Sequence, residues 1–427
     1  MQGGKDLGLD SLQDSSTYRI ETRNKTAIRS QVVTDLNTKF DIVSENQDFP
    51  LIYWNPKFHK NPVKFRPIAG SRDKVLCSLE KVIGKVMKRL TSHFTGYCNV
   101  SERQTGKKHY FVIKNSSQMN NVFSVLRGKA LSFDSYDFSN LYTNFEHEEI
   151  LERLSWLIDL LFNNAKKMYI NVSKNLLKVD YSDEILPVER GWSFSKEKLK
   201  EAIEFLIKNT YVEFGSLVFR QICGIPMGSI PAPDFANLAL AVDEFRFVKK
   251  MLKDKMYSIL AKMNFLCRYL DDIGAPNFPE FHSYISIIYP PTLTLSRSNQ
   301  DSTENVAYLD LSVSVVDNYF VVKVYCKTDD YEFSVITLPF LDSNVAVEMC
   351  YYVYFGQILR FLRICSRLEN FKERCIFLTR LLQNRGYVNS RLASKFNEVL
   401  HRHRRDWSKF QNMVKVRELM VTVVYGE

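Results

Sequence analysis

The chain has 427 residues, of which 45% are hydrophobic and 25% are charged. This balance is that of a folded globular protein and excludes a disordered or fibrous chain. Its eight cysteines include no CxxC pair, so we expect reduced thiols rather than a zinc cage or a small disulfide scaffold. The net charge of +10 suits a polyanionic partner, because each Lys or Arg placed on a phosphate releases counterions.

Membrane insertion and secretion are not indicated. No apolar run reaches the roughly 18 residues that a spanning helix needs, and the first 16 residues are polar, without a signal-peptide pattern. We therefore expect an intracellular protein with no membrane partner.

The first third of the chain combines strands and helices. Residues 1–50 read as a polar N-terminal extension that becomes partly helical, and residues 51–75 as two short strands joined by a Pro/Lys turn. Residues 76–127 are predicted to be helical, since apolar residues three and four positions apart form one stripe: Leu79, Val82, Ile83, Val86, Met87 and Leu90.

The middle third alternates between element types. Residues 163–195 are polar and mixed, which predicts an insertion or a mobile loop, and the Gly/Pro-rich residues 224–233 predict a second loop. Around these loops we expect a strand at 130–138, helices at 147–162, 196–209 and 234–263, and short strands at 211–214 and 217–220.

The last third begins with a hairpin pattern around residues 269–272. Residues 306–326 alternate in hydrophobicity as strands do, and helices with basic faces follow from about residue 346. The order is therefore a basic strand-rich unit, a mixed α/β unit and a basic helical tail. The fold class predicted from this order is α+β.

Two adjacent carboxylates lie in the predicted hairpin, in the tetrad Tyr269-Leu270-Asp271-Asp272. Carboxylates between apolar flanks are costly to bury unless they hold a cation or pair with a base. A plain Asp-Asp turn is the alternative, because Asp favours turns. The strand-forming residues on both sides of the tetrad favour a cation site.

A second source of carboxylate is the strand-like segment that holds Asp134 and Asp137. Magnesium takes hard oxygen ligands, and two such ions about 3.5–4 Å apart can stabilise both the attacking and the leaving oxygen of a phosphoryl transfer. Carboxylates from two separate strands are therefore the expected ligand set for Mg²⁺, with Mn²⁺ as a substitute.

Nine segments between about residues 51 and 405 form a series of motifs: 55–60 (NPKFHK), 65–68 (FRPI), 136–144 (YDFSNLYTN), 221–229 (QICGIPMGS), 268–273 (RYLDDI), 308–311 (YLDL), 327–329 (KTD), 357–360 (QILR) and 382–387 (LQNRGY). In its order, this series is similar to the motifs of reverse transcriptases of Penelope-like retroelements, a lineage related to telomerase reverse transcriptases.

This resemblance implies a right-hand polymerase fold. Its parts would be an N-terminal extension (1–50), fingers (51–130), a palm with an antiparallel sheet and helices behind it (131–345, including the insertion 163–195) and a helical thumb with a basic tail (346–427). It also implies RNA-directed DNA polymerase activity, with an RNA template, a DNA or RNA primer, an RNA–DNA hybrid and dNTPs as partners. The oligomeric state stays open.

The resemblance also assigns roles to residues. Asp137, Asp271 and Asp272 would be the catalytic metal ligands; Asp137 is preferred to Asp134 because Tyr142 then lies five residues on, where an aromatic side chain excludes a ribose 2′-hydroxyl. Further nucleotide-binding positions would be Lys57, Arg66, Gln221 and Gly228. A template–primer duplex would be contacted by Arg360, Arg363, Arg385, Arg402 and Arg404.

Two departures from the family pattern bear on function. The segment after Gly228 reads Ser-Ile-Pro-Ala-Pro-Asp, so its prolines are displaced from the usual Ser-Pro-Leu arrangement. After Asp406 about 20 residues remain, too few for the GIY-YIG endonuclease that such elements commonly append. We expect either an endonuclease-lacking form that uses pre-existing 3′ ends or a truncated copy, and the resemblance implies a nuclear site of action. The alternatives are a degenerate or domesticated copy that only binds nucleic acid, and an RNA-dependent RNA polymerase.

Overall fold

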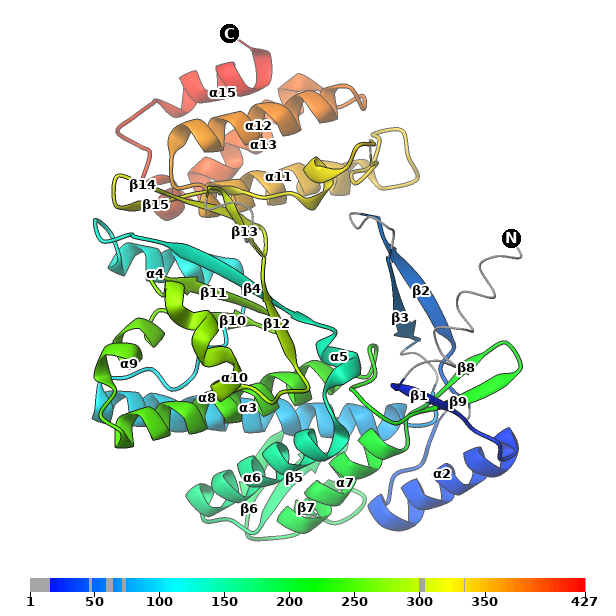
Figure 1. The fold of residues 1–427 in the computed structure, drawn as a ribbon. Helices are drawn as coiled ribbons and strands as arrows, with labels where there is room; N and C mark the ends of the chain where they lie inside the picture. Colours follow the sequence, from blue (N-terminus) through cyan, green and yellow to red (C-terminus); the bar gives the residue numbers. More distant parts are fainter. Residues whose placement is uncertain are drawn as a thin grey trace. The chain divides into compact units, whose positions relative to one another are not determined.

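The computed structural model describes residues 16–45, 48–58, 64–70, 74–298, 304–333 and 335–426. The chain forms two compact units, whose elements are labelled in Figure 1. Unit 1 comprises Met1–Val112, Asp137–Asn264 and Glu280–Ser296; unit 2 comprises Ile113–Tyr136, Phe265–Pro279 and Arg297–Glu427. The predicted palm segment 131–345 thus contributes to both units. The mixture of helices and strands agrees with the predicted α+β class.

Unit 1 is built around the long helix α3 (Cys77–Thr105), which packs against three further helices. All six residues of the predicted apolar stripe are buried in it. Burial of this stripe is what stabilises a helix of this length, because propensity alone contributes little. The packed neighbours are α6 (His147–Ala165), α7 (Lys196–Lys208) and α8 (Ala232–Lys253); α9 (Tyr257–Met263) and α10 (Ile285–Ile288) pack on α8.

The prediction of a mobile loop at 163–195 is wrong. This segment forms a three-stranded antiparallel sheet in the order β6-β5-β7, made of β5 (Tyr169–Ser173), β6 (Val179–Ser182) and β7 (Gly191–Ser195). Only alternate residues of β5 face inward, and Ile170 and Val172 are fully buried. Two buried residues in a polar stretch are too weak a signal for sequence periodicity.

Two small sheets occupy the N-terminal part of unit 1. One has the order β1-β9-β8, where β1 (Tyr18–Ile20) pairs antiparallel with β9 (Leu217–Gln221), which in turn pairs with β8 (Tyr211–Phe214). The other is the predicted hairpin of β2 (Ile52–Lys57) and β3 (Lys64–Ala69). Helix α2 (Lys25–Phe40) confirms that the N-terminal extension is partly helical. The first 15 residues of the extension lie outside the described part.

A four-stranded sheet has the order β10-β11-β4-β12. The predicted hairpin is β10 (Cys267–Tyr269) with β11 (Asp272–Pro276), both in unit 2. Strand β4 (Phe133–Ser139) begins in unit 2 and continues into unit 1 after Tyr136, and β12 (Thr294–Arg297) ends where unit 2 resumes.

The rest of unit 2 is a helical layer over a meander. The meander has β13 (Val306–Tyr308), β14 (Leu311–Val316) and β15 (Tyr319–Val324). The four longest helices of the layer lie side by side in Figure 1, and all of its helices share one apolar core with the meander. They are α11 (Val347–Ile364), α12 (Leu368–Gln383), α13 (Asn389–Arg402), α14 (Arg404–Trp407) and α15 (Val416–Tyr425), with α4 (Met119–Val125) packed on the same core.

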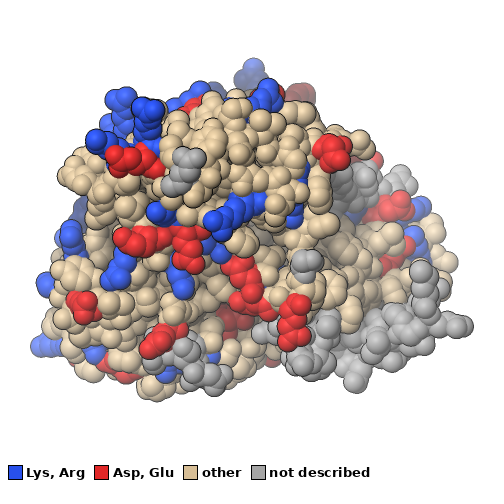
Figure 2. Space-filling model, turned by 90° about the horizontal axis from the view of Figure 1, so that it is seen from above, with Lys and Arg blue, Asp and Glu red and all other residues tan. Residues whose placement is uncertain are grey.

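One face of the molecule is mixed in charge. On the face shown in Figure 2, Lys and Arg side chains are interspersed with Asp and Glu, so the net charge of +10 is not spread there as a field of one sign. None of the described helices is long and apolar enough to cross a bilayer.

Candidate active site

The turn between β10 and β11 presents two carboxylates. Tyr269 pairs with Asp272, so Leu270 and Asp271 form a two-residue turn, and Leu270 has φ of +53°. Such turns require positive φ, which a branched residue adopts at a cost. Both Asp271 and Asp272 are half-buried. Glycine would adopt this conformation more easily than leucine. The surrounding structure therefore holds the Leu270 backbone in a strained conformation.

A buried arginine holds the turn from within unit 2. The Arg268 side chain is fully buried, and its Nη1 donates a hydrogen bond to the Leu270 carbonyl at 3.1 Å. The Arg268 carbonyl in turn accepts from the Ile113 amide at 2.8 Å. A guanidinium is costly to bury without partners, so its presence here fixes the backbone that carries Asp271.

Two aromatic rings pack against the hairpin at Gly274. A Cβ atom added to Gly274 would lie 3.2 Å from the Phe133 ring and 3.3 Å from the Tyr308 ring. The Tyr308 hydroxyl donates to the Cys267 carbonyl at 3.2 Å, and burial raises the pKa of Tyr308 well above its usual range. Tyr308 therefore stays a neutral donor that ties β13 to β10.

The two aspartates of β4 have different environments. Asp134 is buried and forms an ion pair with Arg297, whose Nε donates at 3.0 Å and whose Nη2 makes a second contact with the same oxygen. Asp137, three residues on, is exposed. The pairing gives Asp134 a structural role within unit 2 and makes Asp137 the accessible carboxylate of this strand.

The carboxylates fit a divalent cation by their chemistry, because hard oxygen donors are what Mg²⁺ takes. Within the described ranges, however, no three His, Cys, Asp or Glu side chains are gathered closely enough to form a ready-made metal cage.

In unit 1, the short helix α5 (Leu141–Asn144) carries the half-buried Tyr142 and is joined to the Gly-rich loop at 222–230. The Ile225 amide donates to the Tyr142 carbonyl at 2.8 Å. Gly224 has φ of +84°, and a Cβ there would lie 2.2 Å from the same carbonyl. Only glycine allows this approach.

His147 fastens the loop to the first turn of α6. Its Nε2 donates to the Gly224 carbonyl at 2.9 Å, and the Gly224 amide donates to the Phe145 carbonyl at 2.9 Å. Burial lowers the pKa of His147, so the ring is held as the neutral donor.

The other end of the loop is fixed by a buried ion pair. The Lys74 and Glu80 side chains are 6% and 4% exposed and lie 2.9 Å apart. Glu80 accepts from the Ser229 hydroxyl at 2.8 Å and from the Ile230 amide at 3.2 Å, and Lys74 Nζ donates to the Gly228 carbonyl at 3.4 Å. The Lys74–Glu80 pair is thus hydrogen-bonded to the loop at three successive residues, 228, 229 and 230.

Gly228 itself lies against the end of β3. Its φ is +109°, and a Cβ there would be 2.0 Å from the Ala69 carbonyl, while the Ala69 amide donates to the Met227 carbonyl at 3.0 Å. The displaced prolines after Gly228 are accommodated because Pro231 precedes α8 as its N-cap and Pro233 occupies its first turn, where a missing amide costs nothing.

The remaining predicted nucleotide contacts are of three kinds. Arg66 is exposed on β3. Gln221 is buried, and its Nε2 donates to the Cys223 carbonyl at 3.0 Å, so it supports the loop. Lys57 ends β2, and its side chain lies outside the described part.

The five predicted duplex-binding arginines all lie in unit 2 but differ in exposure. Arg385 is buried, and its Nη1 donates a hydrogen bond to the Leu338 carbonyl, so its role is structural. Three are held by acids: Arg360 by Asp310 at 2.8 Å, Arg363 by Asp406 at 3.1 Å and Arg402 by Glu398 at 2.8 Å. Arg404 is exposed.

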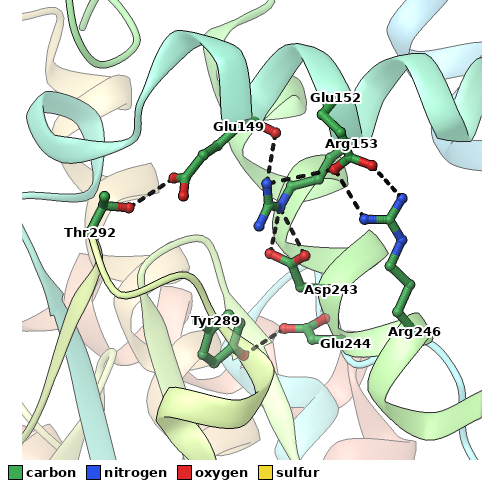
Figure 3. A network of polar contacts seen from close by, with 8 residues as sticks. All are labelled: Glu149, Glu152, Arg153, Asp243, Glu244, Arg246, Tyr289 and Thr292. Carbon is green, nitrogen blue, oxygen red and sulfur yellow. Dashed lines mark hydrogen bonds and ion pairs between the residues drawn. The ribbon is translucent and has the colours of Figure 1, made fainter. Parts of the chain in front are cut away.

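A polar network joins α6, α8 and the segment before β12 in unit 1 (Figure 3). Arg153 on α6 grips Asp243 on α8 through Nε at 2.7 and 2.8 Å, and burial raises the pKa of Asp243 to about 6 although Arg153 lowers it. Glu149 accepts from Thr292 at 2.8 Å, and Glu244 accepts from Tyr289 at 2.9 Å. Two helices and the segment that leads into β12 are thereby joined.

Sequence reasoning missed the supporting residues: Arg268, Arg297, Lys74 and Glu80. Arg268 had a visible signal, since a charged residue between apolar neighbours of a strand needs a buried partner. The Lys74–Glu80 pair had none, because its partners lie about 150 residues away in the chain.

The fold is similar to that of solved polymerases. The chain aligns with telomerase from Candida albicans, solved in complex with a TWJ fragment of telomeric RNA, at a TM-score of 0.57 and 12% identity, over 93% of this chain and 67% of that one. The fold is that of a telomerase-like right-hand polymerase. Weaker likenesses are apo telomerase from Candida tropicalis truncated from its C-terminal domain (TM-score 0.46, 12% identity, 76% and 60% covered) and the Sicinivirus 3Dpol RNA-dependent RNA polymerase (0.40, 11%, 87% and 70%).

Sequence comparison gives nothing further: no protein-family model and no curated protein matches the chain. The likeness to telomerase is thus one of architecture.

Proposed function

We propose that the chain is an RNA-directed DNA polymerase that extends a primer 3′-hydroxyl with dNTPs. The observation that carries the proposal is the placement of carboxylates in a right-hand polymerase fold. Asp271 and Asp272 lie at the β10–β11 turn, and β4, a strand of the same sheet, exposes Asp137 while Arg297 engages Asp134.

These three carboxylates would hold Mg²⁺, or Mn²⁺ in its place, which would activate the attacking 3′-oxygen and stabilise the pyrophosphate leaving group. The protein's own contribution is to keep the carboxylates in place. Arg268 does this for the turn through Leu270, and the strand pairing of β4 does it for Asp137.

Substrate selection would come from unit 1. The exposed guanidinium of Arg66 suits the triphosphate of an incoming nucleotide, because charge-assisted contacts both orient it and offset developing charge. We assign Lys57 the same task from its motif. The half-buried Tyr142, fixed through its own carbonyl to the loop at 222–230, would exclude a 2′-hydroxyl and so favour dNTPs.

The natural partners follow from the motif series. Its likeness to Penelope-like elements leads us to propose a retroelement origin, an RNA template, a DNA or RNA primer and a nuclear site of action. The exposed Arg402 and Arg404 are suited to the backbone of an RNA–DNA hybrid, which would be read by shape.

The proposal is tested by primer extension with the purified full chain on an RNA template, with dNTPs or rNTPs and Mg²⁺ or Mn²⁺. Wild type should extend with dNTPs. Asp271→Asn should lower extension by about 10³-fold or more, because it removes a ligand of the cation that stabilises the transition state.

The matched control is Asp317→Asn. Asp317 also lies in a hairpin turn of unit 2, between β14 and β15, with φ of +52° that Asn tolerates. It should extend like wild type. Equal extension by both variants would refute the site, and tight duplex binding without extension by wild type would favour the binding-only alternative. A preference for rNTPs would favour the RNA polymerase alternative.

A further inference from the structure

A pocket of about 720 Å³ lies in unit 2, on the side of the meander where α4 packs. Its walls come from α4, the outer end of β15, the C-terminal end of α11 and the α14 segment. We call it the basic groove, after the five cationic residues that line it: Arg127, Arg363, Arg367, Arg405 and Lys409.

The charges of the basic groove are not balanced by its own acids. Asp406 lines it and pairs with Arg363 at 3.1 Å. Across the part of the chain that the structure describes, no ion pair involves Arg127, Arg367 or Arg405, and all three are exposed. Three guanidinium groups are therefore available to an anion.

The walls of the basic groove are fixed by hydrogen bonds. Lys409 Nζ donates to the Cys365 carbonyl at 2.8 Å, and Asn120 Nδ2 donates to the Arg363 carbonyl at 2.9 Å. The Val322 amide donates to the Ser366 hydroxyl at 2.8 Å. Three separate elements are thus bound together, so the groove is a built feature rather than a chance gap between side chains.

An aromatic ring lies at the rim. Tyr319 is 44% exposed, and the Arg127 guanidinium lies 6.0 Å from its ring centroid. Exposed aromatic rings beside arginines are the pattern by which proteins bind unpaired bases, since every base has a face that stacks and every phosphate takes a guanidinium fork.

We propose that the basic groove binds a single-stranded segment of nucleic acid, through phosphate contacts with Arg127, Arg367 and Arg405 and base stacking on Tyr319. The proposal rests on the proposed function, which supplies template and primer strands as ligands. A single strand is favoured over a duplex because the pocket is of the size that takes a small ligand and because a paired base offers no face to Tyr319. An acidic peptide would not need the ring.

The test is the affinity of the full chain for a labelled ten-nucleotide pyrimidine RNA, measured by fluorescence anisotropy at several salt concentrations. Replacing Arg127, Arg367 and Arg405 together by Gln should weaken binding about 10- to 100-fold. It should also reduce the slope of log affinity against log salt by about 2, since each single-strand phosphate contact contributes roughly 0.7. Tyr319→Ala should weaken binding about five-fold or more, and Tyr319→Phe should restore it.

The control removes the same charge elsewhere, by Lys250→Gln, Lys253→Gln and Arg417→Gln, all at exposed positions. It should leave the affinity within two-fold of wild type. The proposal is overturned if both triple variants lose affinity equally, or if Tyr319→Ala binds like wild type. It is also overturned if polyglutamate competes as well as the RNA does.

Primer extension separates this proposal from the proposed function. On a short primer–template with few unpaired nucleotides, the groove variant should extend like wild type. Loss of RNA affinity with extension retained supports both proposals. A wild type that binds the RNA through the groove but never extends would refute the polymerase and leave the groove intact.

Discussion

The Gly-rich loop at 222–230 and the β10–β11 turn are both short irregular segments, yet they are fixed in opposite ways. The loop is held from outside by distant residues: Lys74 and Glu80 at one end, and Tyr142 and His147 at the other. The turn is held from within, by the residue that precedes its tetrad, through the contact of Arg268 with Leu270.

The two kinds of support imply different responses to mutation. A loop fixed by many distant contacts depends on the packing of unit 1 as a whole, so its supports should matter first for stability. A turn fixed by its own hairpin should tolerate changes elsewhere and respond to changes in the hairpin itself.

The largest effect on stability is expected for Lys74→Met. It leaves the Glu80 carboxylate buried without its cation, which should lower the free energy of unfolding by about 3–5 kcal/mol. The double variant Lys74→Met with Glu80→Met should recover most of the loss, because two apolar side chains remove the unpaired charge. Chemical denaturation measures both.

The matched control is Lys81→Met. Lys81 pairs with Glu45 at 3.8 Å on the surface, with side chains 47% and 75% exposed, and should cost about 1 kcal/mol or less. A loss in Lys74→Met no larger than in Lys81→Met would show that the loop does not depend on its buried pair.

At the turn, Arg268→Met is the corresponding change. It keeps the bulk of the side chain but leaves the Leu270 carbonyl without its donor, which should cost about 1–3 kcal/mol. The position of Asp271 should then be less well fixed. The extension rate should fall, while the KM for the nucleotide should change less. Wild-type kinetics in a folded Arg268→Met protein would contradict the internal support of the turn.

The smallest effect is a pH dependence of the loop. Because burial lowers the pKa of His147 in the folded protein, its contribution to stability is complete above about pH 6.5, the unfolded value, and is lost as pH falls through the folded value. Thermal unfolding at pH 7.5 and pH 5.5 should show a smaller drop in Tm for His147→Gln than for wild type. Equal drops would remove His147 as a titrating support.

Much of the fold was predictable because its signals are local. The stripe of α3, the helices that follow residue 346 and the alternating strands of the meander each repeat a pattern over several turns or residues. The sheet at 169–195 was missed, since its strands are short and only two residues of β5 and two of β7 are buried.

The candidate site was predictable in its acids but not in their support. The tetrad spans four consecutive residues and Tyr142 follows Asp137 by five, so each of the two signals is local in the sequence. Arg297, the partner of Asp134, lies about 160 residues away from it, and Glu80 lies about 150 residues away from the loop residue that it binds; no periodicity connects them.

The central claim is tested most directly by comparing Asp137→Asn with Asp134→Asn in metal-dependent primer extension and in thermal unfolding. The account predicts that Asp137→Asn abolishes extension and keeps the wild-type Tm, because Asp137 is exposed. Asp134→Asn should lower Tm by weakening the pair with Arg297 while the folded fraction still extends. Undiminished extension by Asp137→Asn, or abolished extension by Asp134→Asn at unchanged Tm, would contradict the assignment.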